Sequence, residues 1–466
     1  MKLYRNAIIL VVVLGLVFGA YMLLKDKIAK KDAAEDGSQT IRITDYSDDK
    51  IKSITVENPD GTFIIEKKDK TWTLTSPTDF NSDSSKVSSI VTNAESVIAD
   101  KLVEENPKGL SMYGLDKPVT LTIKLTDGTD KVILLGNKTP TGSGYYALDK
   151  AVNKVYVLDT YTSEKLLFKK NDIRSTALYT VTSDKIITLA MDRDGSNVFK
   201  SKKLSDTNWS LTSPIECNAN SNAIEPMLTA ISGVTVSEFV ESNAADLDKY
   251  GLAKPKYVFD FSTSEGSYKL QLGAEKTKGS LIYAKLDGSN EVYAIDESAF
   301  TFLDKPFNEI VEAFVYIVNI DQVNKIELDM DGKKTVMGIE TFKDSEGKAD
   351  ADKDKFTVDG KDASGKDAND DQPFRTFYQD LVGISMDSID VNAKPAGNAE
   401  ITVTYYLKSA PGTMKVEFLP KDAENYYVVE NGKYTGMVVS KTKDSYGIKS
   451  MRSSYKTLME FVAAQK

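Results

Sequence analysis

One hexapeptide occurs twice in this chain, and its recurrence constrains the fold more than any other feature. Trp72-Thr-Leu-Thr-Ser-Pro77 returns as Trp209-Ser-Leu-Thr-Ser-Pro214, 137 positions later, and these are the only two tryptophans. The same offset carries two more motifs: Tyr113-Gly114-Leu115-Asp-Lys-Pro118 onto Tyr250-Gly251-Leu252-Ala-Lys-Pro255, and Leu135-Gly136 onto Leu272-Gly273. Chance does not keep an ungapped register over this distance. The sequence therefore predicts a duplicated module.

A helical stripe indicates a third, more diverged copy. Apolar residues recur at helical spacing at Val87, Ile90, Val91, Ala94, Val97 and Ile98, then at Ile224, Met227, Leu228, Ile231 and Val234, and again at Phe374, Phe377, Tyr378, Leu381 and Ile384. Period-2 runs split by turn residues surround each stripe and predict antiparallel strands. We therefore expect an α+β protein in which an N-terminal transmembrane helix precedes three tandem repeats, each an antiparallel β-sheet with one packed α-helix. The repeats occupy residues 40–176, 177–316 and 317–466, and a second short helix near Thr160 to Phe168 closes the first.

The third repeat contains an insertion at residues 343–371 with almost no apolar side chains, which predicts a mobile loop. Asp350, Asp352 and Asp354 have the spacing of a calcium loop. However, Lys355 stands where such a loop needs glycine, and Lys361 stands where it needs a bidentate glutamate. We predict no metal site here.

Residues 7–24 are 18 uncharged and mostly aliphatic positions, close to the length that spans a bilayer as a helix. Residues 1–6 are then a short cytoplasmic N-terminus, and the polar residues 25–39 a flexible stalk. An uncleaved signal anchor is favoured over a cleaved signal, because Phe18-Gly-Ala20 is a poor cleavage site.

The flanking charges leave two orientations open. Four lysines follow the apolar segment while only Lys2 and Arg5 precede it, so the positive-inside rule taken literally puts the bulk in the cytoplasm. Against this, a short basic start before an apolar run has the form of an export signal, and long domains translocate largely regardless of charge. We predict a single-pass protein of the cell membrane that contacts the bilayer through residues 7–24, with its bulk extracytoplasmic.

Composition narrows the possible chemistry. The chain has no histidine, a single cysteine (Cys217) and a formal charge of −10, which argues against a Cys–His nucleophile pair, a cysteine-rich zinc site and nucleic-acid binding. Ser-x-x-Lys occurs at Ser47, Ser345, Ser440 and Ser453, as scattered matches expected by chance in a chain rich in serine and lysine. Paired carboxylates for glycoside cleavage stay open, because acidic residues are everywhere. No catalytic residue, cofactor or metal site is predicted.

The repeated motifs have two interpretations. The tryptophans either form an exposed platform for a sugar or peptide, or fill the core beside the following helix while Ser-Pro turns the chain, and we expect the second. In Tyr-Gly-Leu-x-Lys-Pro, glycine is expected to supply a positive φ, leucine to enter the core and proline to precede the next strand. These motifs are predicted to be structural.

Together, the N-terminal apolar segment and the motifs quoted above resemble the bacterial family of domains of unknown function named DUF4340. The resemblance covers Lys50 to Asp296 well and the final third weakly. It implies an extracytoplasmic, membrane-tethered protein often encoded beside ABC-type exporter components, and it transfers no catalytic residue. Pro140, which ends Leu135-Gly-Asn-Lys-Thr-Pro in the first copy, is Thr277 in the second.

These observations predict a non-enzymatic, membrane-anchored extracytoplasmic protein that acts as an interaction or accessory component of a membrane complex. An ABC-type transporter is the first choice of partner in the envelope. The alternative is a cell-surface or cell-wall polysaccharide-binding module that uses exposed aromatics. A third hypothesis is a carboxylate-dependent hydrolase, which needs several carboxylates converging in one cleft.

Overall fold

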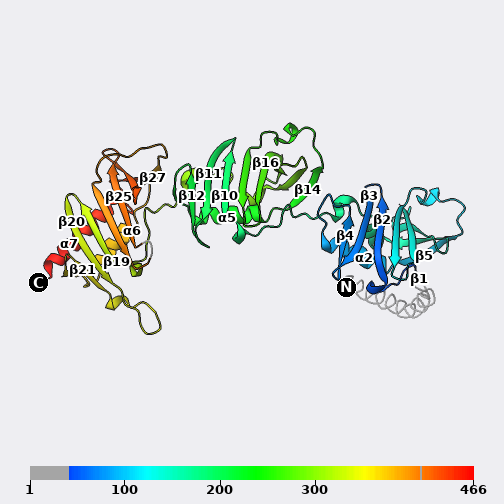
Figure 1. The fold of residues 1–466 in the computed structure, drawn as a ribbon, viewed down its shortest axis with the longest axis horizontal. Coiled ribbons are helices and arrows are strands. Elements are labelled where there is room, and N and C mark those ends of the chain that lie inside the picture. Colours follow the sequence, from blue (N-terminus) through cyan, green and yellow to red (C-terminus); the bar gives the residue numbers. More distant parts are fainter. Residues whose placement is uncertain (1–40, 410–411, 466) are drawn as a thin grey trace, which may run out of the picture. The chain divides into compact units, whose positions relative to one another are not determined.

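The computed structural model describes residues 41–409 and 412–465. They contain three nine-stranded antiparallel sheets with few helices (Figure 1), so the predicted α+β class with three repeated sheets is confirmed. The chain divides into two compact units, one ending at Thr176 and the other beginning at Ala177. The first unit holds one sheet and the second holds two.

The first sheet has the strand order β1-β5-β9-β8-β7-β6-β2-β3-β4. Its strands are β1 (Ile41–Arg42), β2 (Ile51–Asn58), β3 (Gly61–Lys68), β4 (Thr71–Ser76), β5 (Ile98–Glu105), β6 (Val119–Leu125), β7 (Asp130–Lys138), β8 (Gly144–Asp149) and β9 (Lys154–Asp159). The helices are α2 (Ser84–Glu95), α3 (Thr160–Leu166) and α4 (Lys170–Ile173), with 3-10 turns η1 (Asp48–Lys50) and η2 (Ser111–Tyr113). The helix α3 confirms the second short helix predicted near Thr160 to Phe168, and α4 is a further helix that was not predicted. Both α3 and α4 contact α2.

The second sheet repeats this order, read from β4 to β5, but lacks an equivalent of β1 and adds the short strand β13 beyond β12. It runs β13-β12-β11-β10-β15-β16-β17-β18-β14. Its elements are η3 (Ser183–Lys185), β10 (Thr188–Arg193), β11 (Ser196–Lys203), β12 (Trp209–Ser213), β13 (Cys217–Asn218), α5 (Ser221–Ser232), β14 (Val236–Glu241), η4 (Asp248–Tyr250), β15 (Tyr257–Ser262), β16 (Ser267–Thr277), β17 (Leu281–Leu286), β18 (Val292–Asp296), η5 (Glu297–Ala299) and η6 (Phe307–Glu309).

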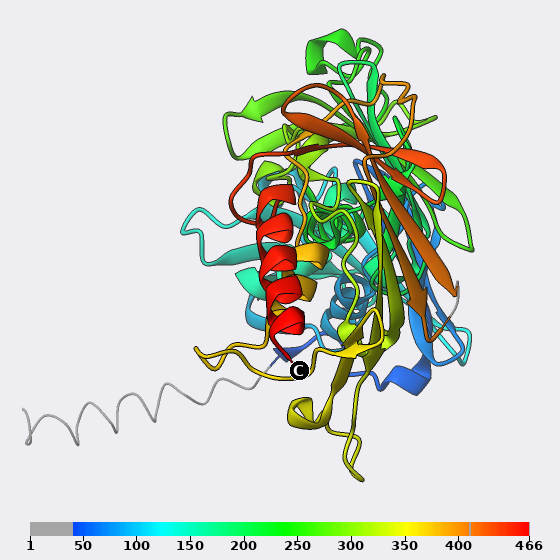
Figure 2. The ribbon, with the colours of Figure 1, turned by 90° about the vertical axis from the view of Figure 1, so that its left-hand side faces the viewer.

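The third sheet has the matching order β22-β21-β20-β19-β24-β25-β26-β27-β23. Its elements are η7 (Ile320–Gln322), β19 (Val323–Met330), β20 (Lys333–Glu340), η8 (Ala351–Lys353), β21 (Lys355–Val358), β22 (Lys361–Asp362), α6 (Pro373–Val382), β23 (Ser388–Ile389), β24 (Ile401–Leu407), β25 (Thr413–Pro420), β26 (Asn425–Glu430), β27 (Lys433–Ser440) and α7 (Ile448–Ala464). Figure 2 shows α7, in red, running beside α6. The rings of Phe377 and Tyr455, with centroids 5.7 Å apart, pack the two helices together.

Each predicted helical stripe is buried. In α2 the buried residues are Val87, Ile90, Val91 and Ala94, and the Asp83 side chain caps the helix by accepting from the backbone N–H groups of Ser85 and Lys86. The helix ends at Glu95, so Ile98 begins β5 instead of extending the stripe. The same face is buried in α5 and α6. The stripes therefore pack these helices on their sheets, as the spacing predicted.

Two expectations about the third module are wrong. The insertion at 343–371 is not a loop throughout, because it contains β21 and β22, and Phe356 and Val358 are buried. The module also has a second long helix, α7, which the repeat pattern did not predict.

The predicted transmembrane segment, residues 7–24, and the stalk, residues 25–39, lie outside the described residues. Within residues 41–409 and 412–465, no helix is both long and apolar enough to cross a bilayer.

Candidate functional site

The two tryptophans occupy the same place in the first two sheets. Trp72 lies near the start of β4 and Trp209 begins β12, and their side chains are 8% and 5% exposed. In each copy the proline of the motif follows the strand through a cis peptide bond, at Ser76–Pro77 and Ser213–Pro214. Neither indole therefore stands open as an aromatic platform.

In the first module, the edge of the indole is covered by a polar contact. The Trp72 indole N–H donates to Asp48 Oδ1 at 2.5 Å, and Asp48 is ion-paired with Lys67. The Lys67 ammonium lies 5.8 Å from the centre of the Trp72 ring. Hydrogen bonds from Lys67 and then Trp72 lower the pKa of Asp48, so the carboxylate is held in its charged form.

In the second module, the equivalent lysine points elsewhere. Lys203 pairs across the strands with Trp209, as Lys67 does with Trp72, so the register makes the two lysines equivalent. However, Lys203 Nζ lies 3.0 Å from the backbone oxygen of Asp184 and 3.3 Å from Asp206 Oδ1. The same strand pair therefore carries two different side-chain arrangements.

A cavity of about 910 Å³ lies beside Trp209. Its walls come from one flank of α5, from η3 and from the turn between β11 and β12; α5, β11 and β12 are labelled in green in Figure 1. The charged residues that line it are Asp184, Lys203, Asp206 and Glu225. This volume is within the range of sites that hold small ligands or short peptide segments.

The Tyr-Gly-Leu and Leu-Gly motifs contact each other. A Cβ at Gly136 would lie 2.3 Å from the backbone oxygen of Tyr113, and one at Gly273 would lie 2.2 Å from that of Tyr250. Only glycine allows so close an approach. Gly114 and Gly251 have φ values of 70° and 67°, the left-handed conformation that the sequence predicted.

The tyrosines of these motifs also repeat their partners. Tyr113 donates to Glu104 at 2.8 Å and packs edge-on against Tyr146, with centroids 5.0 Å apart. Tyr250 donates to Glu241 and packs against Tyr283 at 4.9 Å. Leu115 and Leu252 are buried beneath these loops, and Pro118 and Pro255 precede β6 and β15. The two motifs fasten a loop onto the sheet.

Sequence comparison agrees with this duplication. The family model described as Domain of unknown function (DUF4340) matches residues 72–208 and again residues 209–389. The chain belongs to the DUF4340 family. Searches of curated proteins and of solved structures found no match.

Each DUF4340 match begins at a motif tryptophan and not at the start of a sheet. The first match runs from β4 through β11, so it joins most of the first sheet to the opening strands of the second. The second match ends at Ile389, the last residue of β23, and leaves β24 to α7 outside. The sequence unit of the family is therefore offset from the structural unit.

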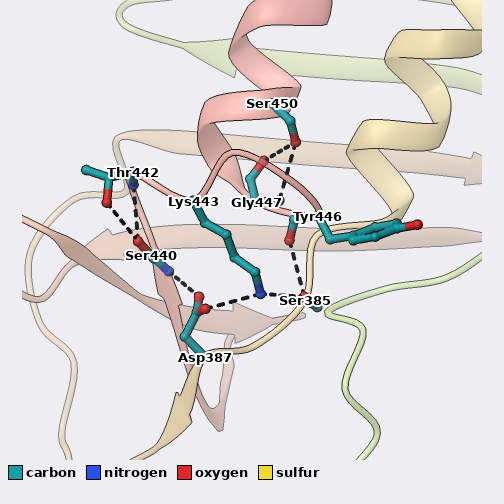
Figure 3. Close-up of polar contacts among 8 residues, drawn as sticks. All are labelled: Ser385, Asp387, Ser440, Thr442, Lys443, Tyr446, Gly447 and Ser450. Carbon is teal, nitrogen blue, oxygen red and sulfur yellow. Dashed lines mark hydrogen bonds and ion pairs between the residues drawn. The ribbon is translucent and has the colours of Figure 1, made fainter.

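The DUF4340 chain also contains a serine–lysine contact that sequence spacing did not find. Ser440 and Lys443 form one of the Ser-x-x-Lys matches, but Lys443 instead donates to Ser385 Oγ at 3.0 Å (Figure 3). Lys443 is also ion-paired with Asp387 at 3.1 Å, and Ser385 donates to the backbone oxygen of Tyr446.

This geometry is unsuited to a nucleophile. A lysine that activates serine must be neutral and accept its proton, whereas Lys443 donates to Ser385 and is ion-paired with Asp387. Asp387 also accepts from the backbone N–H of Ser440 at 2.7 Å. The cluster ties the segment after α6 to the segment before α7.

The remaining candidates carry no reactive arrangement. Cys217 is buried, and burial raises the pKa of its thiol to about 12. Asp354, from the calcium-like spacing, is instead ion-paired with Arg375 and accepts from the backbone N–H of Phe342. Over the part of the chain that the structure describes, no three metal-ligating side chains come together.

Proposed function

We propose that this DUF4340 chain is a non-enzymatic, membrane-anchored extracytoplasmic protein that serves as an interaction or accessory component of a membrane complex. An ABC-type transporter is the partner class that the family resemblance implies. The observation that carries the proposal is the use of the repeated motifs: Tyr113 with Gly136, and Tyr250 with Gly273, fasten loops to sheets. The motifs that the first two modules share therefore hold the fold together.

The side-chain chemistry supports a binding role. The chain has no histidine, and the lysine that contacts Ser385 is ion-paired with Asp387. The burial of Trp72 and Trp209 favours this proposal over polysaccharide binding through exposed aromatics. The carboxylates at the Trp209 cavity stand beside Lys203, and hydrogen bonds lower the pKa of Asp184, which does not suit a general acid.

The anchor is part of the proposal because residues 7–24 have the length and composition of a bilayer span. Attachment beside a transporter would place the modules at a high local concentration relative to their partner.

Cross-linking in the native membrane tests this function. The full-length chain, tagged at its C-terminus, is cross-linked in intact cells, purified and analysed by mass spectrometry, with a chain lacking residues 7–24 as the control. We expect an integral membrane partner that is recovered only with the anchored chain. Protease treatment of intact cells, with spheroplasts and lysed cells alongside, is expected to digest the modules without lysis. Recovery of no membrane protein, or protection of the modules until lysis, would refute the proposal.

A further inference from the structure

The place beside the aromatic residue near the start of β4, β12 and β21 is closed in the first and third modules and open in the second. In the first module, Asp48 accepts from the indole N–H of Trp72 and binds Lys67. The site is thus filled by a carboxylate and a cation that belong to the chain itself.

The third module fills the equivalent place in a similar way. β21 stands where β12 stands in the strand order, and its first buried residue, Phe356, stacks on Phe374 of α6 at 4.3 Å. The Arg375 guanidinium lies 5.3 Å from the Phe356 ring and is ion-paired with Asp354. Again an aromatic ring, a cation and a carboxylate of the same chain lie together.

The second module lacks this filling. Among residues 41–409 and 412–465, no group accepts a hydrogen bond from the Trp209 indole N–H, and no cation lies over its ring. Lys203, the counterpart of Lys67, is held by the backbone oxygen of Asp184 and by the exposed Asp206. The cavity of about 910 Å³ occupies the space beside them.

The cavity has an acidic wall. Asp184, Asp206 and Glu225 line it against the single ammonium of Lys203. Asp184 has only a 3.7 Å contact with Lys185, in which both side chains are mostly exposed, and it accepts from the Thr182 hydroxyl at 2.5 Å. Hydrogen bonds, first that from Thr182, lower the pKa of Asp184, so this carboxylate is charged at neutral pH.

We propose that this cavity binds a basic segment of a partner protein. A lysine or arginine side chain of that segment faces Asp184 and Glu225, and a backbone carbonyl beside it accepts the hydrogen bond of the Trp209 indole. The inference rests on the proposed function, since it names the chemistry by which the partner is recognised. The bound segment would supply the groups beside Trp209 that the chain itself supplies beside Trp72 in the first module and beside Phe356 in the third.

The wall also selects against other occupants. A phosphate or a lipid headgroup of negative charge would be repelled by the three carboxylates. A sugar needs an open aromatic face to stack on, and Trp209 is only 5% exposed. A peptide supplies both the cation and the carbonyl acceptor.

Fluorescence of a single tryptophan tests the proposal. In the full-length Trp72→Phe chain, Trp209 is the only tryptophan. This chain is titrated with a short lysine-rich peptide and with the same peptide acetylated on every lysine. We expect a saturable change in Trp209 emission with the first peptide, an affinity that falls as salt is raised, and no response to the acetylated peptide.

Variants then locate the binding. Asp184→Asn and Glu225→Gln are each expected to weaken binding by about two- to fivefold, as for exposed ion pairs. Glu340→Gln, in β20 of the third sheet, removes the same charge at an exposed residue that does not line the cavity and should leave the affinity unchanged. In the Trp209→Phe chain, Trp72 should not respond, because Asp48 already accepts its N–H.

Each contrary result has a distinct meaning. A response to the acetylated peptide, an equal loss with Glu340→Gln, or no binding at all would overturn the basic-segment inference. Free lysine amide binding as tightly as the peptide would overturn it in favour of a small amine. If cross-linking recovers a membrane partner equally well with Asp184→Asn and Glu225→Gln combined, the site fails while the proposed function stands.

Discussion

Replacing Gly136 with alanine is the sharpest test of how the repeated motifs work. The new Cβ would lie 2.3 Å from the Tyr113 backbone oxygen and 3.1 Å from the Leu115 side chain. An ordinary contact needs about 1 Å more. The loop that carries Tyr113 must therefore move away from the sheet.

The cost can be worked out from what the loop holds. Displacement weakens the hydrogen bond from Tyr113 to Glu104, for about 1 kcal/mol, and the edge-on contact with Tyr146, for about 0.5–1.5 kcal/mol. Overpacking of this kind costs about 1–3 kcal/mol in general. We expect Gly136→Ala to lower the free energy of unfolding of the first unit by about 2–3 kcal/mol.

Urea unfolding of the Trp209→Phe chain, followed by Trp72 emission, measures this unit alone. Gly109→Ala is the matched control, because a Cβ at Gly109 has no atom within 4 Å and its φ is not positive. The control should be neutral or slightly stabilising. Equal stability of Gly136→Ala and Gly109→Ala would refute the account of the motif.

Three further predictions concern the second unit. Burial raises the pKa of Glu430 from 4.5 to about 7. The folded state therefore binds an extra proton between these pH values, and the free energy of unfolding falls as pH rises through them. Glu430→Gln should reduce the difference in unfolding free energy between pH 5 and pH 8 by about 1–2 kcal/mol, allowing for partial exposure, and an unchanged difference would contradict this. The Cys217 thiol, with a pKa raised to about 12 by burial, should react with iodoacetamide at pH 8 much more slowly in the native chain than in urea, as mass spectrometry would show. Lys443→Met should lower the free energy of unfolding of this unit, measured by urea titration, by about 1 kcal/mol. The control Lys449→Met removes a largely exposed ion pair with Asp444 and should cost under about 0.5 kcal/mol. Equal effects would exclude a role for the Ser385 contact.

The repeat register predicted the architecture because packing imposes the same pattern three times. The stripes of α2, α5 and α6 survive a change of almost every residue, since each needs only an apolar face toward its sheet. By contrast, α7 follows β27 as the short helix α3 follows β9, but it is much longer. Its stripe of Ile448, Met451, Leu458 and Val462 was present in the sequence, but the seven residues of α3 did not predict a helix of 17 residues at this place.

The short strand β21 escaped prediction because its surroundings are polar. Phe356 and Val358 alternate inward before an Asp359-Gly360 turn, which is a hairpin signal, yet they stand among lysines and aspartates.

The cavity at Trp209 could not be predicted from the sequence for a different reason. Lys67 and Lys203 are the same residue type at the same register position, and only the direction of each side chain distinguishes a closed site from an open one. The residues that line the cavity come from η3, β11, β12 and α5, and no motif joins them.

The self-contained pairing of the three sheets has a consequence for biogenesis. Every described strand completes its ladder with strands of its own sheet, and the last partner of each sheet is made within the same repeat. A nascent chain emerging N-terminus first can therefore finish one sheet before the next is synthesised, without waiting for distant sequence. Natural truncations and fusions in such a lineage are expected to fall between sheets, where gain or loss of a whole repeat leaves no ladder broken.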